Sequence, residues 1–204
     1  MKNITKVEAV SKTKFRVEVD HEFAFVLYKG ELKRFHIAEG EELSEEVYGQ
    51  IRSEVILKRA KLRAMHLLTD MGRTESGLRE KLRQNQYPED MIEQAMDYVR
   101  SFGYLDDLKY AENYIESHKN SKSKKELYGV LVQKGVPSEQ IQLAFESSYE
   151  EESTQEAIQK LIAKRRVDVA TATEEELHKL YGYLARKGFR YEEIRKAIEG
   201  FNNY

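Results

Sequence analysis

Residues 180–197 read LYGYLARKGFRYEEIRKA, and two earlier stretches of the chain have the same spacing of apolar residues. They are residues 127–144, LYGVLVQKGVPSEQIQLA, and residues 78–95, LREKLRQNQYPEDMIEQA. Each begins with leucine, continues with apolar residues at +4, +9 and +14, and reaches alanine at +17 without a gap. The leucines at +4, which are Leu82, Leu131 and Leu184, lie 49 and 53 residues apart. The sequence therefore repeats a unit of about fifty residues.

This template predicts two short helices joined by a tight turn in every copy. Leucines four residues apart form one apolar stripe of a helix, and the later apolar residues begin a second stripe. Pro88 and Pro137 suit the first turn of the second helix. A third helical stretch precedes each pair, at residues 60–68, 108–116 and 154–165. The turns are expected at Asn85-Gln86, Lys134-Gly135 and Lys187-Gly188.

Three-helix units of this kind cannot bury their apolar faces alone, and stacking them gives an elongated, curved body that suits large partners. The expected helical repeat domain spans residues 44–204, with a first repeat at about 57–104, a second at about 105–150 and a third at about 152–204. Ser44 is the expected N-cap of a long helical stretch that runs toward Met71, with Gly72 at its end.

The first 43 residues have a different pattern, which predicts a small β-rich N-terminal extension. Residues 14–20, KFRVEVD, alternate apolar and polar side chains as a half-buried strand does. Residues 22–28 and 32–37 are expected to follow as strands, with Lys29 and Gly30 in a hairpin turn between them. The predicted fold is therefore mainly α, with tandem three-helix repeats after an antiparallel sheet of three or four strands.

Composition narrows the possible functions. The chain of 204 residues has no cysteine, which excludes thiol catalysis and cysteine-containing zinc sites. Its five histidines are not at the spacing of helical metal ligands, so no metal or other cofactor is expected. The first residues, MKNITKVEAVSK, lack the apolar core that a signal peptide has, and no apolar stretch approaches the roughly 20 residues that span a bilayer. A cytoplasmic monomer without a membrane partner is expected.

Residues 102–110, FGYLDDLKY, contain two adjacent aspartates that could serve a metal or acid–base site or could start a helix. A catalytic site needs further carboxylates or histidines at the same place, and the sequence indicates none. An aspartate at a helix N-cap accepts a backbone N–H, and Gly103 suits the end of the preceding helix. The stretch is therefore interpreted as the junction between two repeats, in which Tyr104 and Leu105 pack as core residues and Asp106 or Asp107 is the cap.

Basic residues near helix ends are the candidates for binding a partner or DNA. A net charge of −2 gives no overall preference for nucleic acid, and a run of charges is often only a solvated helix face. The acidic stretch around residues 150–152 is interpreted as an exposed connection. The candidate binding residues are Lys58, Arg59, Lys61, Arg63, Arg79, Arg83, Lys122, Lys124, Lys125, Lys164, Arg165, Arg166, Arg186, Lys187 and Arg190.

The three copies in register and the stretch GYLDDLKYAENYI resemble the RecX family, the bacterial regulators of the RecA recombinase. The resemblance covers roughly residues 55 to 204. It implies a protein that is not an enzyme and that binds the RecA filament on DNA. It also implies inhibition of ATP hydrolysis, strand exchange and the coprotease function, with roles in DNA repair, recombination and the SOS response.

Two alternatives belong to other functional classes. The first is a helical-repeat protein that binds single- or double-stranded DNA through its basic patches, with an affinity that falls steeply with salt. The second is a hydrolase or nuclease that uses Asp106 and Asp107. Replacement of both aspartates by asparagine would abolish activity in the second case, and would affect only stability if they cap a helix.

Overall fold

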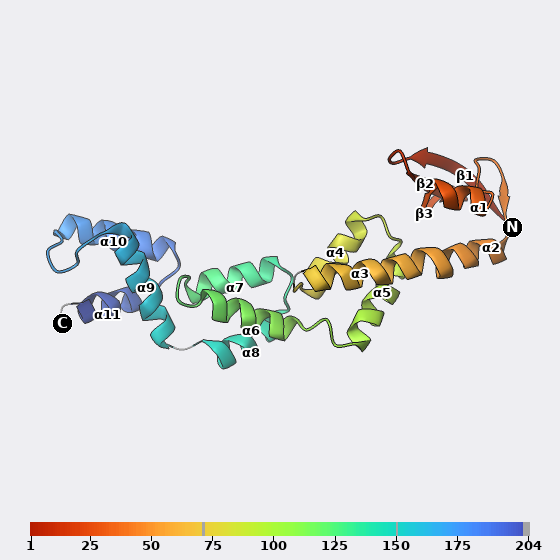
Figure 1. Ribbon diagram of the computed structural model, residues 1–204. Coiled ribbons are helices and arrows are strands. Elements are labelled where there is room, and N and C mark those ends of the chain that lie inside the picture. The colour runs from red at the N-terminus through yellow and green to blue at the C-terminus, as the bar shows by residue number, and fades with distance from the viewer. Residues whose placement is uncertain (71, 150, 202–204) are drawn as a thin grey trace. The chain divides into compact units, whose positions relative to one another are not determined.

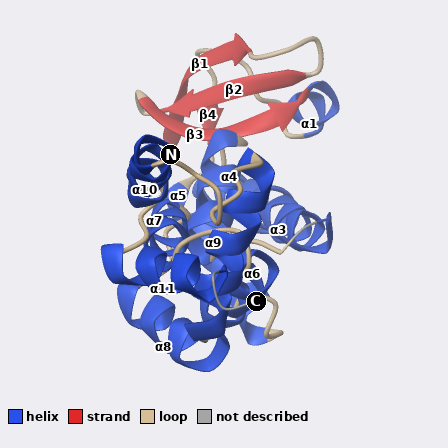
Figure 2. Cartoon of the chain, turned by 90° about the vertical axis from the view of Figure 1, so that its left-hand side faces the viewer, coloured by secondary structure: helices blue, strands red, loops and turns tan. Residues whose placement is uncertain are grey.

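The computed structural model describes residues 1–70, 72–149 and 151–201, apart from the side chains at positions 70, 151, 152 and 201. It confirms the predicted fold class, because the chain is mainly helical and begins with an antiparallel sheet (Figure 1). Figure 2 shows the strands gathered in this sheet. The chain divides into two compact units, Met1–Leu105 and Asp106–Tyr204. The first unit holds the sheet and the first repeat, and the second unit holds the other two repeats.

The sheet has four antiparallel strands in the order β3-β2-β1-β4. These are β1 (Lys2–Ala9), β2 (Lys14–Val19), β3 (Glu22–Tyr28) and β4 (Glu42–Leu43). Strands β2 and β3 are those predicted from alternation, with Val17 opposite Phe25. The sequence interpretation did not assign β1, which pairs with both β2 and β4.

The strand predicted at residues 32–37 and the hairpin turn at Lys29 and Gly30 are wrong. Helix α1 (Lys29–Arg34) occupies this segment. The Glu31 side chain accepts the backbone N–H of Tyr28 at 2.7 Å, which stabilises the start of the helix. Leu32 and Phe35 lie three residues apart and both pack on the core of the sheet. That spacing suits one face of a helix, whereas in a strand the two side chains would point to opposite faces.

A long helical stretch follows the sheet, as predicted. It comprises α2 (Glu45–Gln50), a π-helical segment η1 (Ile51–Leu57) and α3 (Lys58–Asp70). Ser44 is the N-cap, and its hydroxyl accepts the Val47 N–H at 3.2 Å. The predicted end near Met71 lies outside the described residues. Ile51 and Ile56 are buried in the core of the sheet, so this helix joins the sheet to the first repeat.

Each repeat consists of three helices around its own core, and each of the three preceding helices falls where it was predicted. The first repeat has α3, α4 (Glu75–Gln84) and α5 (Glu89–Ser101). The second has α6 (Asp107–His118), α7 (Lys124–Gln133) and α8 (Ser138–Ser148). The third has α9 (Glu151–Arg165), α10 (Glu174–Arg186) and α11 (Tyr191–Phe201). The template leucines are at most 1% exposed, which identifies the repeated pattern as the core of each unit.

The turn inside the template has the same hydrogen bonds in all three copies. In the third copy, Gly188 N–H donates to Ala185 O at 2.9 Å and Phe189 N–H donates to Leu184 O at 3.2 Å. This is a Schellman motif, which requires a left-handed residue at its centre and favours an apolar contact across it. Gln86, Gly135 and Gly188 are the left-handed residues, with φ between 61° and 94°. The +4 and +9 positions of the template are the two sides of that contact, which explains their spacing.

The junction between the first and second repeats has a similar construction. Gly103 has a φ of 68° and ends α5 with a further Schellman motif, and Asp106 Oδ1 accepts the Lys109 N–H at 2.8 Å as the N-cap of α6. Asp107 is the first residue of that helix. The prediction that Tyr104 is a core residue is wrong, because it is 53% exposed and its ring stacks on that of Phe102, which is also exposed. Leu105 is partly buried against the core of the first repeat.

Candidate partner-binding site

The candidate arginines of the first unit are mostly neutralised by carboxylates. Arg79 on α4 forms ion pairs with Glu93 and Glu89 of α5, and Arg83 contacts Glu89 at 2.6 Å. The hydrogen bond with Glu93 raises the pKa of Arg79, and the same contact lowers the pKa of Glu93. These pairs join α4 to α5, so their charges act within the repeat.

Two of the four candidates on α3 have partners inside the first unit. Arg59 donates to Glu31 at 2.5 Å and to the Val26 carbonyl at 3.1 Å, and this pair of bonds ties the helix to the sheet. Lys61 Nζ lies 4.9 Å from the centroid of the Tyr98 ring. Arg63 is partly buried, whereas Lys58 is exposed to solvent. The first unit therefore does not gather these cations into one site.

The second unit brings candidate residues of two repeats together at a close contact, which we call the repeat seam. Ser123, the N-cap of α7, accepts the Glu126 N–H at 3.1 Å and donates its hydroxyl to the Lys187 carbonyl at 2.7 Å. Lys187 and Gly188 form the turn between α10 and α11. A Cβ at Gly188 would lie 2.8 Å from Ser123 Oγ and 3.2 Å from Lys125 Cβ. Only glycine fits this turn, because the backbone there is left-handed and nearly touches α7.

A groove of about 780 Å³ opens at the repeat seam, and we call it the seam groove. Three of the candidate cations line it: Lys124 and Lys125 from the first turn of α7, and Arg190 from the start of α11. The other lining residues are Tyr128, Tyr149, Thr154, Ala185, Gly188, Phe189 and Glu193. Three positive side chains and one carboxylate thus face the same opening beside aromatic rings.

Aromatic rings and hydrogen bonds orient the groups of the seam groove. Lys124 Nζ lies 5.0 Å from the centroid of Phe145 and 5.9 Å from that of Tyr149, which favours a cation over the ring faces. Tyr149 shares a hydrogen bond of 3.0 Å with Thr154, and burial raises its pKa. The Glu193 carboxylate accepts the Arg190 backbone N–H at 2.7 Å, and the Arg190 residue is exposed to solvent.

Arg190 stands where the other two copies of the template have proline. Pro88 and Pro137 are the N-caps of α5 and α8, one residue before the position predicted for them. Proline lacks a backbone N–H, so nothing has to satisfy that group in the first two repeats. In the third repeat, Arg190 does have a backbone N–H, and the Glu193 carboxylate accepts it. Arginine in place of proline at this template position therefore puts a guanidinium at the seam groove, and the backbone N–H of Arg190 still has an acceptor.

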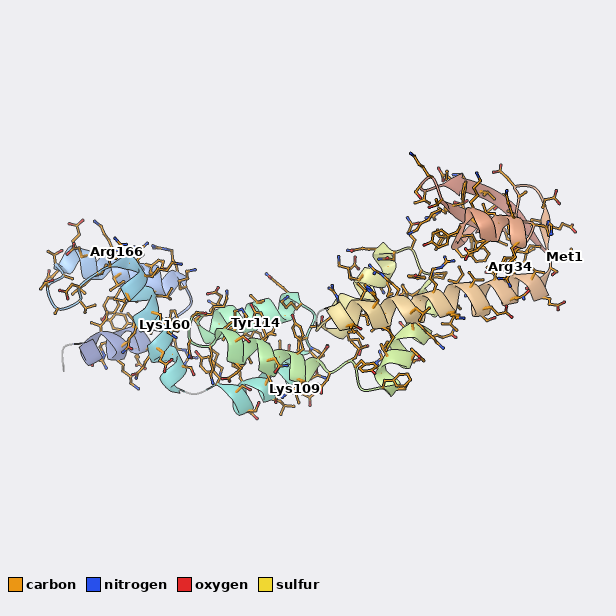
Figure 3. The ribbon with its side chains drawn as sticks, in the orientation of Figure 1. Met1, Arg34, Lys109, Tyr114, Lys160 and Arg166 are labelled. Atoms are coloured by element: carbon orange, nitrogen blue, oxygen red, sulfur yellow. The ribbon has the colours of Figure 1, made fainter. Side chains whose placement is uncertain are left out.

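The remaining candidates lie elsewhere in the second unit. Lys122 pairs with Glu126 at 2.6 Å, a contact that raises its pKa. Arg165, the last residue of α9, lies over the Tyr183 ring, 4.0 Å from its centroid. Arg166, labelled in Figure 3, directly follows the helix. The side chains of Lys164, Arg186 and Lys187 are exposed. Of the fifteen candidates, only Lys124, Lys125 and Arg190 line the seam groove.

Sequence interpretation missed the uncharged residues of the seam groove, above all Tyr128, Tyr149 and Thr154. Only Tyr128 of these three lies within the template, directly after Leu127, and that position was the one usable signal. The spacing of the template residues describes contacts within one repeat. It therefore could not predict how the second repeat contacts the third. Within the described ranges, no helix is long and apolar enough to span a membrane, and no three metal-binding side chains lie together.

Two models of RecX domains match this chain. The RecX third three-helix domain matches residues 151–198, and the RecX first three-helix domain matches residues 60–98. Both ranges fall on repeats described above. The matches therefore agree with the division of the helices into three-helix units.

Relatives that carry the name regulatory protein RecX match nearly the whole chain. That of Caldanaerobacter subterraneus subsp. tengcongensis is 30% identical, with 94% of this chain and 95% of the relative covered. That of Clostridium acetobutylicum is also 30% identical, with 96% and 94% covered. A crystal structure of a regulatory protein RecX superposes with a TM-score of 0.61 at 26% identity, and covers 96% of this chain and all of that one. This chain therefore belongs to the RecX family of regulatory proteins.

Proposed function

We propose that this chain binds the RecA recombinase filament on DNA and inhibits it without catalysing a reaction of its own. Membership of the RecX family is the observation that carries the proposal. The inhibited activities are ATP hydrolysis, strand exchange and the coprotease function, and the chain acts in the bacterial cytoplasm where the filament forms. The groups at the seam groove support a role in binding.

The seam groove is the proposed contact with the filament. Lys124, Lys125 and Arg190 can donate charge-assisted hydrogen bonds to carboxylates or phosphates, both of which a protein filament on DNA offers. The planar guanidinium of arginine can donate two parallel hydrogen bonds to one carboxylate or phosphate. Tyr128 is 36% exposed and gives the cations an apolar neighbour on which a partner side chain can pack.

Binding to preassembled RecA filaments on single-stranded DNA tests the proposal. Fluorescence anisotropy of the labelled chain gives the affinity of the wild type and of a triple variant with Lys124, Lys125 and Arg190 replaced by glutamine. We expect the triple variant to bind at least about tenfold more weakly, because even one truncated charge pair at a buried contact costs on the order of 2 kcal/mol and tenfold corresponds to about 1.4 kcal/mol.

A matched control removes the same net charge away from the seam groove. Glutamine at Lys12, Lys109 and Lys160 serves this purpose, because all three side chains are exposed and Lys109 and Lys160 lie on α6 and α9 (Figure 3). We expect this variant to bind within about twofold of the wild type, since exposed charges contribute little. No binding of the wild type would contradict the proposed function, whereas equal losses in both variants would contradict only the assignment to the seam groove.

Direct binding of DNA is the second candidate function, and the position of Tyr128 beside the three cations favours it. Phosphate neutralisation and stacking of bases on aromatic rings are the two contributions that single-strand binding needs. The test is the affinity for single-stranded DNA without RecA at several salt concentrations. Loss of three phosphate contacts should reduce the slope of log K against log salt by about 2. Lack of binding at low salt would remove this candidate.

A further inference from the structure

A second groove, which we call the α10 groove, lies within the third repeat and is lined by residues of α10 and α11. It has a volume of about 460 Å³, and Tyr191 beside it is 68% exposed. The Tyr191 ring lies 5.2 Å from that of Tyr181, measured between centroids. The apolar lining consists of Leu177, Tyr181, Gly182, Ala185, Tyr191 and Ile194. Within the described part of the chain, this apolar face remains open to solvent.

The repeat register identifies what covers the same face in the second repeat. Leu127 and Leu180 hold the same position in the template, so Tyr128 of α7 corresponds to Tyr181 of α10. Tyr128 lines the seam groove, where the turn at Gly188 packs against the N-terminus of α7. The α10 groove is therefore the counterpart of a face that receives a helix–turn–helix corner one repeat earlier.

Two changes of residue type alter the chemistry of that face. Lys124 and Lys125 of the second repeat correspond to Leu177 and His178 of the third, so an occupant of the α10 groove meets an apolar side chain and an imidazole where the seam groove has two lysines. Glu174 also lines the α10 groove.

Carboxylates surround the start of α10. The first turn holds Glu174, Glu175 and Glu176. Glu175 pairs with Lys179 at 2.6 Å, and Glu176 accepts the Thr173 N–H at 2.9 Å in a capping box, which lowers the pKa of its carboxyl. A partner with cations beside its apolar side chains complements this edge.

We infer that the α10 groove docks a helix of a partner protein, one that presents apolar side chains flanked by lysine or arginine. In this contact the partner protein would cover the face of α10 that corresponds to the face of α7 against which this chain's own third repeat packs at the repeat seam. The helix-in-groove mode uses apolar anchors at helical spacing, which fits an elongated groove between two helices. This site adjoins the seam groove at Ala185, which lines both, but none of the three seam-groove cations lines it, so the second unit has two neighbouring surfaces of different chemistry.

A second copy of the chain is a poorer occupant. Specific dimers bury about 800 Å² on each partner, which requires much more surface than one groove between two short helices.

Two equivalent glycines provide a matched pair of variants. Gly182 lines the α10 groove, and a Cβ there would meet only Arg186 Nη1 at 3.5 Å. Gly129 holds the same template position in α7 and has nothing within 4 Å of its Cβ position. Leucine at either site improves helix propensity. Gly182→Leu fills the α10 groove, whereas Gly129→Leu leaves it open, so a difference between the variants reports on the groove and not on folding.

The experiment uses the full chain with synthetic peptides of leucine and lysine or of leucine and glutamate, both patterned as amphipathic helices. We expect the wild type and Gly129→Leu to bind the leucine–lysine peptide at least about tenfold more tightly than Gly182→Leu does, and the leucine–glutamate peptide to bind weakly to all three. Equal binding by the two variants, or no preference between the peptides, would overturn the inference. Self-association of the wild type that Gly182→Leu abolishes would also overturn it, because the occupant would then be a second copy.

The RecA filament provides a separate comparison that relies on the proposed function. If the filament supplies the docking helix, Gly182→Leu also weakens filament binding and Gly129→Leu does not. If only peptide binding changes, the α10 groove takes a different partner and the inference stands. If the wild type does not bind filaments, the proposed function fails while the peptide result still decides the inference.

Discussion

Replacement of Gly188 by alanine tests the close contact at the repeat seam. Gly188 has a φ of 94°, and an alanine held in this left-handed backbone conformation destabilises the fold by about 1–2 kcal/mol. Its Cβ would also lie 2.8 Å from Ser123 Oγ, and relief of this overlap costs a further 1–3 kcal/mol or so. We expect a loss of about 2–5 kcal/mol in the free energy of unfolding of the second unit. Gly103→Ala is the control, because its φ is 68° and nothing lies within 4 Å of its Cβ position.

Urea unfolding followed by circular dichroism gives the overall loss, and amide hydrogen exchange assigns it to one unit or the other. Gly103→Ala should lose only the conformational penalty of about 1–2 kcal/mol. In Gly188→Ala, the amide of Glu126 should also exchange faster, because the Ser123 hydroxyl that caps it is displaced. Equal losses in the two variants, with unchanged exchange at Glu126, would refute the close approach of the turn to α7.

Other predictions concern the helix cap, the ion pairs and the exposed rings. Asp106→Ala should cost about 1 kcal/mol in urea unfolding and Asp106→Asn only a few tenths, while inhibition of RecA stays unchanged in both. Loss of inhibition in a variant that keeps its stability would contradict a purely structural role for this residue. Arg79 lowers the pKa of Glu93, so it adds stability above the ordinary carboxyl pKa of 4.5 that disappears as pH falls below it. Thermal unfolding should therefore show a smaller acid loss in Arg79→Gln than in the wild type, and parallel curves would contradict the pairing. Tyr87→Ala should cost about 2 kcal/mol and Tyr104→Ala less than about 1, because Tyr87 packs on two cores and Tyr104 is exposed; urea midpoints in the opposite order would contradict the packing.

The repeat architecture could be predicted because its pattern is local. The template records a helix stripe and a Schellman turn, both of which depend on residues within a few positions of each other. Gln86 in place of glycine did not obscure the turn, since the apolar pair Leu82 and Tyr87 was enough to identify it. The capping of α6 by Asp106 could be predicted for the same reason.

The errors occur where local patterns were ambiguous. Residues 32–37 contain β-branched and aromatic side chains, but the contacts of Leu32 and Phe35 with the core of the sheet favour a helix. Phe102 lies three residues after Val99, a spacing that would place it on the same helix face, yet it is the C-cap of α5 and directly precedes the left-handed Gly103. An apolar residue there stacks on Tyr104 and stays exposed.

The seam groove was beyond sequence reasoning because it depends on how one repeat meets the next. Lys124 and Arg190 are far apart in the chain and in different repeats, and no periodicity relates them. The close contact between Ser123 and the turn at Gly188 brings them to the same opening. Arg59 and Arg79 looked equally suitable in the sequence, but both are engaged by carboxylates of their own unit.

ATP hydrolysis by RecA on single-stranded DNA is the most direct test of the central claim. The rate is measured as the purified chain is titrated to several-fold excess over RecA, with the triple glutamine variant of Lys124, Lys125 and Arg190 beside it. We predict that the wild type suppresses hydrolysis in a saturable manner and that the triple variant needs a concentration about tenfold higher for the same effect. An unchanged rate at excess wild-type chain would contradict the proposed function.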